Sequence, residues 1–139
     1  MNAPKLILYH KQSTSARTRF LRLDHGGVCG LEPLPADATV SDGATGPGKV
    51  VTHPAPFLRA AESHLGLPAG SLEAEPGFRC RVTSAEGASE VFLARFVTTD
   101  PPFEKAADRG GTFIDLTQAR GLPAVELALL RRAYELILG

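Results

Sequence analysis

The most informative segment of this 139-residue chain runs from residue 56 to residue 67 and reads PFLRAAESHLGL. It has a proline in its first turn and a glycine at its end, which are the residues that helices favour at these two places. Phe57, Leu58, Ala61 and Leu65 recur at helical spacing on one apolar face. The segment therefore predicts an amphipathic helix over residues 56–66, and the other elements are placed around it.

The residues before this helix favour strands and a loop. Apolar runs at 5–10 and 17–24 flank a short polar segment and predict a β-hairpin. The Pro- and Gly-rich residues 32–48 predict a long surface loop that contains a brief strand near 38–40. A short strand is expected at 49–52, just before the helix.

The residues after the helix favour an antiparallel pair of strands. Apolar and polar side chains alternate over 78–83, which predicts a strand with one face in water. Residues 91–97 are apolar on both faces apart from Arg95, so we expect this strand to be central in its sheet. Gly87 lies in the turn between the two strands.

The last third of the chain predicts a helical turn at 105–108, a short strand at 112–116 and a long helix at 123–138. Glu126 complements the positive end of that last helix. The apolar positions of this helix predict a buried stripe made of Leu129, Leu130, Ala133, Leu136 and Ile137. The length and the element order together predict a single α/β (α+β) domain over residues 1–139.

Composition argues against several classes of partner. Lys plus Arg and Asp plus Glu number 15 each, so there is no basic excess and no nucleic-acid partner is expected. No run approaches the roughly 18 apolar residues of a membrane span, and no signal sequence is expected at the N-terminus. Cys29 and Cys80 are too few for a disulfide framework. We expect them to be reduced, buried thiols in a cytoplasmic protein.

Two local motifs lack the context that their chemistry needs. Residues 43–49 have the glycine and lysine spacing of a phosphate-binding P-loop. Val50 stands where such a loop needs a hydroxyl, and a strand is expected after the motif instead of a helix, so it does not predict a P-loop. Cys29 follows His25 in a Gly-rich segment and is a weak candidate nucleophile. The four histidines have no zinc-site spacing, and no metal site is predicted.

Arg17, Arg19 and Arg22, together with Lys11, form the one basic cluster of the sequence. They fit a solvated sheet face best, and the alternative is a phosphate-binding surface on a strand.

From Leu58 to the end of the chain, the order of elements resembles the Nudix superfamily. Residues 58–67 are similar to the end of a Nudix box, which closes on Arg-Glu-apolar-x-Glu-Glu-x-Gly-apolar. Arg59 matches the arginine of that pattern, Ala61 its apolar position, and Gly66 with Leu67 the closing pair. The resemblance implies a Nudix-like mixed sheet packed between helices.

The resemblance also indicates what this chain lacks. The three glutamates of the pattern fall on Ala60, Ser63 and His64. In the family those glutamates hold magnesium and activate water, a role for which magnesium needs hard oxygen ligands. Glu62 is acidic but stands at the variable position, rotated by about 100° from its neighbour. We therefore expect no catalytic residue, no bound metal and no cofactor.

The function expected from these observations is a non-catalytic Nudix-like domain that binds a nucleotide or another phosphorylated small molecule. A protein-interaction or homodimerisation domain is an alternative, with contact surfaces at 32–48 and 100–103. A divergent magnesium-dependent nucleoside-diphosphate hydrolase is another, with acids drawn from Glu62, Glu73, Glu75 and Glu104. The candidate ligand-binding residues are Arg17, Arg19, Lys49, Arg59 and Glu62.

Overall fold

The structure is a computed structural model that describes residues 4–13, 15, 17–30, 32–42, 53–78 and 80–138. Its elements follow in chain order as β1 (Lys5–Lys11), β2 (Thr18–Arg22), β3 (Thr39–Asp42), α1 (Ala55–Leu65), β4 (Leu72–Ala74), β5 (Cys80–Ser84), β6 (Gly87–Phe96), α2 (Phe103–Ala107), β7 (Thr112–Ile114), a 3₁₀ helix (Leu116–Gly121) and α3 (Ala124–Leu138). Within this described part, no helix is long and apolar enough to cross a membrane.

The described strands form one mixed sheet in the order β3-β5-β6-β1-β2-β7, and β4 also pairs with β6. The β1–β6 pair is parallel, whereas the other pairs are antiparallel. β6 uses both of its edges, because β1 pairs along one edge while β5 and then β4 pair along the other. The prediction that the 91–97 strand is central is therefore confirmed, although β6 begins at Gly87, which was expected in the turn, and ends at Phe96.

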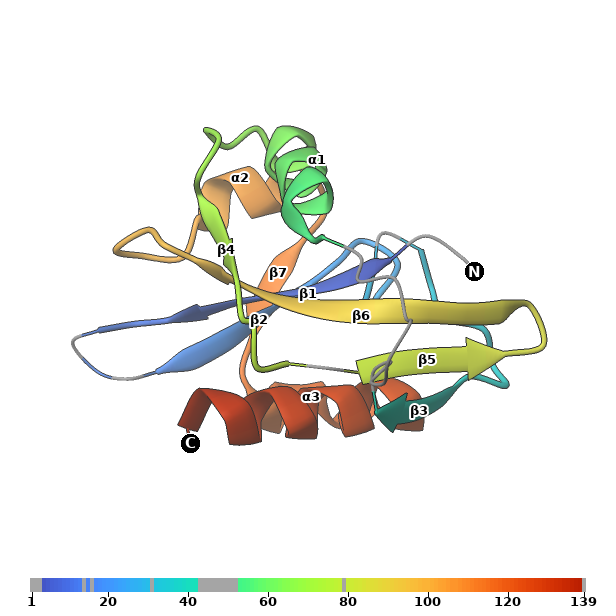
Figure 1. Cartoon of the computed structure of the whole chain (residues 1–139). Coiled ribbons are helices and arrows are strands. Elements are labelled where there is room, and N and C mark those ends of the chain that lie inside the picture. The colour runs from blue at the N-terminus through green and yellow to red at the C-terminus, as the bar shows by residue number, and fades with distance from the viewer. Residues whose placement is uncertain are drawn as a thin grey trace.

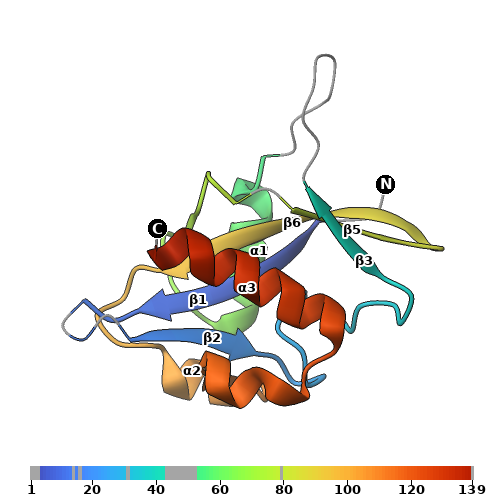
Figure 2. The same ribbon diagram turned by 90° about the horizontal axis from the view of Figure 1, so that it is seen from below.

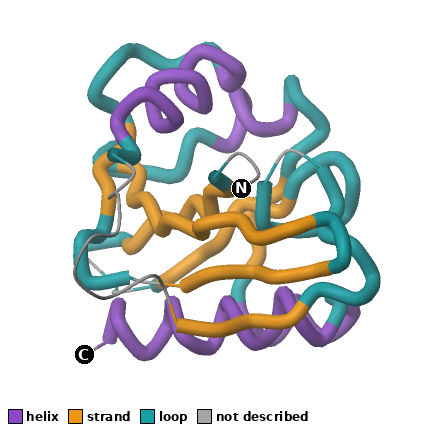
Figure 3. The backbone as a smooth tube through the Cα atoms, turned by 45° about the vertical axis from the view of Figure 1, so that its right-hand side comes forward, coloured by secondary structure: helices purple, strands orange, loops and turns teal. Residues whose placement is uncertain are grey.

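Helices cover both faces of this sheet. α1 and α2 lie on one face and α3 lies on the other, as Figures 1 and 3 show from two directions. Figure 2 looks onto the α3 side and shows this helix running across the sheet. The expected α/β (α+β) architecture, with a mixed sheet between helices, is confirmed.

Alternation along β1 supplies both hydrophobic layers, since neighbouring side chains of a strand point to opposite faces. Leu6 and Leu8 pack in the cluster that contains the apolar face of α1. Ile7 and Tyr9 pack in the larger cluster that contains the buried residues of α3. The 5–10 run is apolar on both faces because β1 lies between two helical layers.

The helix predicted at 56–66 is α1, and Gly66 ends it as expected. Gly66 has a φ of 72°, in the left-handed region that glycine adopts most easily. The N–H of Leu67 then bonds back to the carbonyl oxygen of Glu62 at 2.8 Å. The chain turns sharply here and leads into β4.

Several expectations about the strands and the last helix need correction. β4 was not expected, because three residues carry too short a pattern to read without their partner β6. The strand expected at 112–116 ends at Ile114, and Asp115 instead caps the 3₁₀ helix. Leu136 is 37% exposed and not buried, since it lies near the end of α3 against the surface turn at Gly77. The strand expected at 49–52 lies outside the described residues.

A buried carboxylate attaches the segment after β2 to the start of α3. The backbone N–H groups of Val28 and Cys29 donate to Oε1 of Glu126 at 2.7 and 3.1 Å. Glu126 is only 4% exposed and lies in the first turn of α3, where the helix dipole favours a negative charge. Gly27 is required beside it, because a Cβ at Gly27 would lie 2.5 Å from the same oxygen.

We expect Glu126→Ala to lower the free energy of unfolding by about 2–4 kcal/mol, because it leaves two buried N–H donors without an acceptor. Glu126→Gln keeps an acceptor oxygen and should cost less. Urea unfolding followed by circular dichroism measures both, with the exposed Glu135→Ala on the same helix as the control, expected to stay within about 0.5 kcal/mol. Equal stability of Glu126→Ala and the control would contradict the role assigned to this carboxylate.

Candidate functional site

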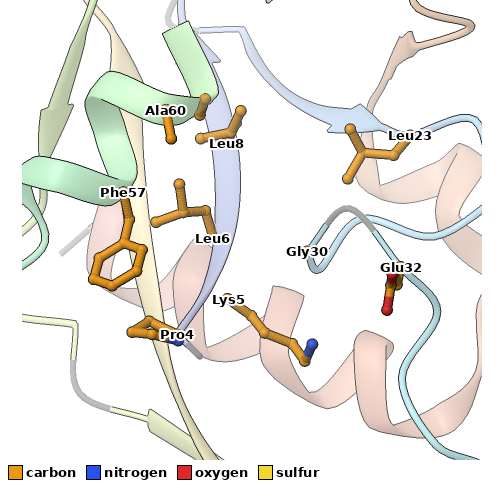
Figure 4. Close-up of a pocket in the computed structure, with 10 residues that line it drawn as sticks. Pro4, Lys5, Leu6, Leu8, Leu23, Gly30, Glu32, Phe57 and Ala60 are labelled. Carbon is orange, nitrogen blue, oxygen red and sulfur yellow. The ribbon is translucent and has the colours of Figure 1, made fainter. Parts of the chain in front are cut away.

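A cleft of about 270 Å³ lies between α1, β1 and the segment that follows β2. It is lined by Pro4, Lys5, Leu6, Leu8, Leu23, Gly30, Glu32, Phe57, Ala60 and Ala61. Figure 4 shows α1 on one side of it and Leu23, Gly30 and Glu32 on the other. Most of its surface is apolar, as is usual for small-molecule sites.

The shape of the cleft follows from the elements around it. Leu6 and Leu8 point toward α1 because of the strand alternation, and they lie between its two walls (Figure 4). Phe57 is half-buried at the first turn of α1, and the methyl group of Ala60 lies one turn further on. A long side chain at position 60 would fill space that the alanine leaves open.

The opposite wall is held against β1 by Gly30. Its N–H donates to the carbonyl oxygen of Leu6 at 3.0 Å, and its φ of 76° is again left-handed. A Cβ at Gly30 would lie 3.3 Å from Cδ of Lys5, so glycine lets the wall and the lysine stem approach closely. Leu23 and Glu32 complete this wall.

Lys5 and Glu32 are the two charged residues that line the cleft. The Lys5 side chain extends from β1 toward the side on which Gly30 and Glu32 lie (Figure 4). Among the described residues, neither side chain has an ion-pair partner within 4.0 Å or a hydrogen bond. An apolar cleft thus carries one cation and one anion that are available to a ligand.

The Nudix-box positions are divided between this cleft and other surfaces. Ala60 lines the cleft, while Ser63 and His64 are exposed. Across the described part of the chain, no group of three or more His, Cys, Asp or Glu side chains is arranged to hold a metal ion. The side chain that α1 presents to the cleft at position 60 is a methyl group.

Glu62, the one acidic residue of α1, faces the other way and is 1% exposed. Its Oε2 accepts from the N–H groups of Gly70 and Leu72, at 3.0 and 2.8 Å. Its Oε1 lies 2.9 Å from Nε of Arg59, which makes an ion pair although the angles are not those of a hydrogen bond. The carboxylate therefore attaches the loop after α1 to the helix and positions β4.

The candidate arginines are held at separate places. Arg59 also donates to the carbonyl oxygen of Leu72 at 3.3 Å, and its side chain stays 46% exposed. Arg17 forms an ion pair with Asp115 at 3.7 Å. Lys49 lies outside the described residues.

Arg19 places its guanidinium 5.6 Å from the ring centre of Phe103 in α2. Arg17 directly precedes β2 and Arg19 lies near its start, whereas Leu23 lines the cleft after the end of that strand. Leu23 is six residue steps beyond Arg17 along an extended chain, which is about 20 Å. The structure does not bring Arg17 and Arg19 to the cleft, and a phosphate-binding role for them stays a prediction.

Two of the remaining candidate acids are bound to other groups, and the third is exposed. Glu75 accepts from the hydroxyl of Tyr9 at 2.5 Å, and Glu73 forms an ion pair with Arg95 at 2.9 Å. Glu104 lies in the short helix α2, exposed to solvent. These acids do not converge on Glu62.

Cys29 and Cys80 are both free and buried, as expected. Burial and the nearby Glu126 carboxylate raise the pKa of the Cys29 thiol from 9.0 to about 12. His25 is engaged through both ring nitrogens, with the N–H of Gly27 at 3.2 Å and the carbonyl oxygen of Gly30 at 2.9 Å. The arrangement keeps Cys29 protonated, which is the opposite of what a nucleophile needs.

None of the described candidate ligand-binding residues lines this cleft, and sequence reasoning missed Lys5, Leu23, Glu32 and Phe57 as ligand contacts. One signal was available for Lys5, because a lysine inside an apolar strand must reach water at an end or a cleft. Nothing in the local pattern of Glu32 distinguishes it from the rest of its loop.

Comparisons with known proteins give information about the fold of this chain. Comparison of the sequence with family profiles and with curated proteins found no match. Among solved structures, the chain is similar to C. elegans Ap4A hydrolase, a Nudix-family protein, with a TM-score of 0.53 and 16% sequence identity. The likeness covers 99% of this chain and 96% of that one. The chain therefore has a Nudix-like fold.

We expect Glu62→Ala to lower the free energy of unfolding by about 3 kcal/mol, because two buried N–H groups lose their acceptor and Arg59 loses its counter-charge. Glu62→Gln should cost less, since its amide oxygen can still accept. Chemical denaturation measures both changes, with the exposed Glu135→Gln as the control. A stability equal to that of the control would remove the structural role of Glu62 and return it to the candidate ligand contacts.

The raised pKa of Cys29 predicts an inert thiol and a loss of stability in alkali. In the unfolded chain the thiol ionises near pH 9, whereas in the folded protein it stays protonated up to about pH 12. The unfolded state therefore binds fewer protons in this window, and the free energy of unfolding should fall as pH rises through it. Burial and the Glu75 hydrogen bond also raise the pKa of the Tyr9 phenol, which acts in the same direction.

Alkylation with iodoacetamide at pH 8 tests the thiol directly. We expect native protein to react far more slowly than protein in 8 M urea, added as the unfolded control. Modification of Cys29 in the native protein at the rate of a small free thiol would contradict this assignment.

Proposed function

We propose that this Nudix-like domain binds a nucleotide or another phosphorylated small molecule in the cleft beside α1, without metal-dependent hydrolysis. The observation that carries the proposal is the cleft itself. It adjoins Ala60, the position at which a Nudix box has a glutamate, and it offers apolar walls with Lys5 among its lining residues. A site without that carboxylate repels an anion less.

The size of the cleft favours one part of such a ligand. Drug-sized ligands occupy pockets of about 300–1,000 Å³, and this cleft, at about 270 Å³, lies just below that range. One ring system fits it, with the rest of the ligand outside. The apolar walls and the half-buried Phe57 suit a nucleobase, since aromatic contacts to bases contribute about 1–3 kcal/mol each.

The phosphate groups would then lie toward the mouth of the cleft and the exposed side of α1. Lys5 is placed to contact them or the base, and Arg59 has a half-exposed guanidinium one residue from Ala60. Arg59 is already paired with Glu62, so its contribution to a phosphate contact is smaller than that of a free arginine. The name of the similar hydrolase also points to a nucleotide, and we extend that to this chain as part of the proposal.

A thermal-shift screen of nucleoside mono-, di- and triphosphates at millimolar concentration tests the proposal. A ligand at about 100 times its Kd should stabilise the protein by about 2.7 kcal/mol. Stabilisation should persist in EDTA, because the described residues supply no group that could hold a metal. Phe57→Ala should weaken binding about tenfold by removing one wall, and Phe103→Ala, an exposed phenylalanine away from the cleft, is the matched control.

Two results would contradict the proposal. One is the absence of any stabilisation by the whole panel. The other is release of phosphate from nucleoside diphosphates in the presence of magnesium, which would favour the hydrolase alternative. Homodimerisation, the remaining alternative, stays a prediction.

A further inference from the structure

Two opposite charges line an otherwise apolar cleft, and this pattern limits what the cleft can bind well. Lys5 has only hydrogen-bond donors and the Glu32 carboxylate has only acceptors. Among the described residues neither has an oppositely charged partner, although both line the same 270 Å³. A ligand that carries an acceptor beside donors would satisfy both groups at once.

Resting on the function proposed above, we infer that the cleft selects guanine among the nucleobases. One edge of guanine carries the O6 acceptor next to the N1–H and N2–H donors. Lys5 would donate to O6, while Glu32 would accept from the two N–H groups, as carboxylates do from base amino groups. Lys5 and Glu32 are thus the residues that determine base specificity.

The other bases fit this pair of charges less well. Adenine has an amino donor where guanine has O6, so it would face the Lys5 ammonium with the wrong polarity. Uracil offers a carbonyl and one N–H, which leaves half of the carboxylate unused. Cytosine, like adenine, presents an amino group beside a ring acceptor. A hydrogen bond to a charged group contributes about 1.5–3 kcal/mol, so each mismatch should weaken binding by about tenfold or more.

The walls of the cleft are compatible with a flat ring. Phe57 from α1 and Leu23 from the opposite wall lie on either side of the space above β1 (Figure 4). Their apolar surfaces can cover the two faces of a purine, while its polar edge is turned to Lys5 and Glu32. Ala60 adds no polar group that would compete.

Isothermal titration with GMP, IMP, AMP and UMP in EDTA tests this inference. We expect GMP to bind best, IMP about tenfold more weakly because it lacks the amino group, and AMP and UMP more weakly than GMP by at least as much. Glu32→Gln should lower the affinity for GMP about tenfold and change that for AMP little. Lys5→Met, which keeps most of the side-chain length, should also lower the affinity for GMP.

Glu104→Gln and Lys105→Met are the matched controls, since both residues are exposed in α2, and neither should change any affinity. Similar affinities for the four nucleotides, or a Glu32→Gln variant with unchanged GMP binding, would overturn the guanine inference and leave the proposed function standing. Binding of none of the nucleotides would overturn the proposed function itself. A fall in melting temperature in both cleft variants with unchanged GMP affinity would mean that Lys5 and Glu32 only stabilise the fold, and it would also overturn the inference.

Discussion

The parallel pairing of β1 with β6 is the contact on which the rest of the structure depends. It runs from Lys5 opposite Val91 to Tyr9 opposite Arg95, and it joins the β2–β7 half of the sheet to the β3–β5 half. It also fixes which side chains of β1 face which helix. The two hydrophobic layers and the cleft beside α1 all follow from that register, because a shift by one residue would exchange the faces.

Two buried glutamates complete the fold in similar ways. Glu62 accepts two backbone N–H groups from the loop after α1, and Glu126 accepts two from the segment after β2. A carboxylate that is almost fully buried is stabilising only where such donors compensate for its lost hydration. In a helix that resembles a Nudix box, the one acidic side chain therefore serves the architecture. The segment attached by Glu126 carries Gly30, which forms a wall of the cleft.

The cleft of this Nudix-like fold differs in its chemistry from a magnesium site. Magnesium sites need several carboxylates at one place, and the described residues do not supply them. What remains beside α1 is an apolar space with one lysine and one glutamate. Such a site is suited to hydrogen bonding and ring stacking, which is why we interpret it as a binding site and assign it no metal-dependent step.

Local patterns were enough to predict the hairpin, the central strand, both long helices and the loss of the box carboxylates at Ala60, Ser63 and His64. Each of these features depends on residues that are neighbours in the sequence, such as a periodic apolar pattern, a proline or a glycine. The three residues of β4 could not be predicted, since they form a strand only by pairing with β6. A local signal existed for the 3₁₀ helix, because Asp115 and Gln118 form a capping box, but the apolar residues before and at its start favour a strand.

The properties of the candidate site likewise fall into those that the sequence could predict and those that it could not. The sequence by itself determined that α1 is a helix with a Nudix-like end and without the usual acids, because those properties belong to one continuous segment. Only the tertiary structure decided that Glu62 turns into the protein, that Arg17 and Arg19 do not line the cleft, and that Lys5, Glu32 and Phe57 do. These residues are separated by up to about fifty positions, and which of them share a surface depends on strand pairing and helix packing that no local pattern records.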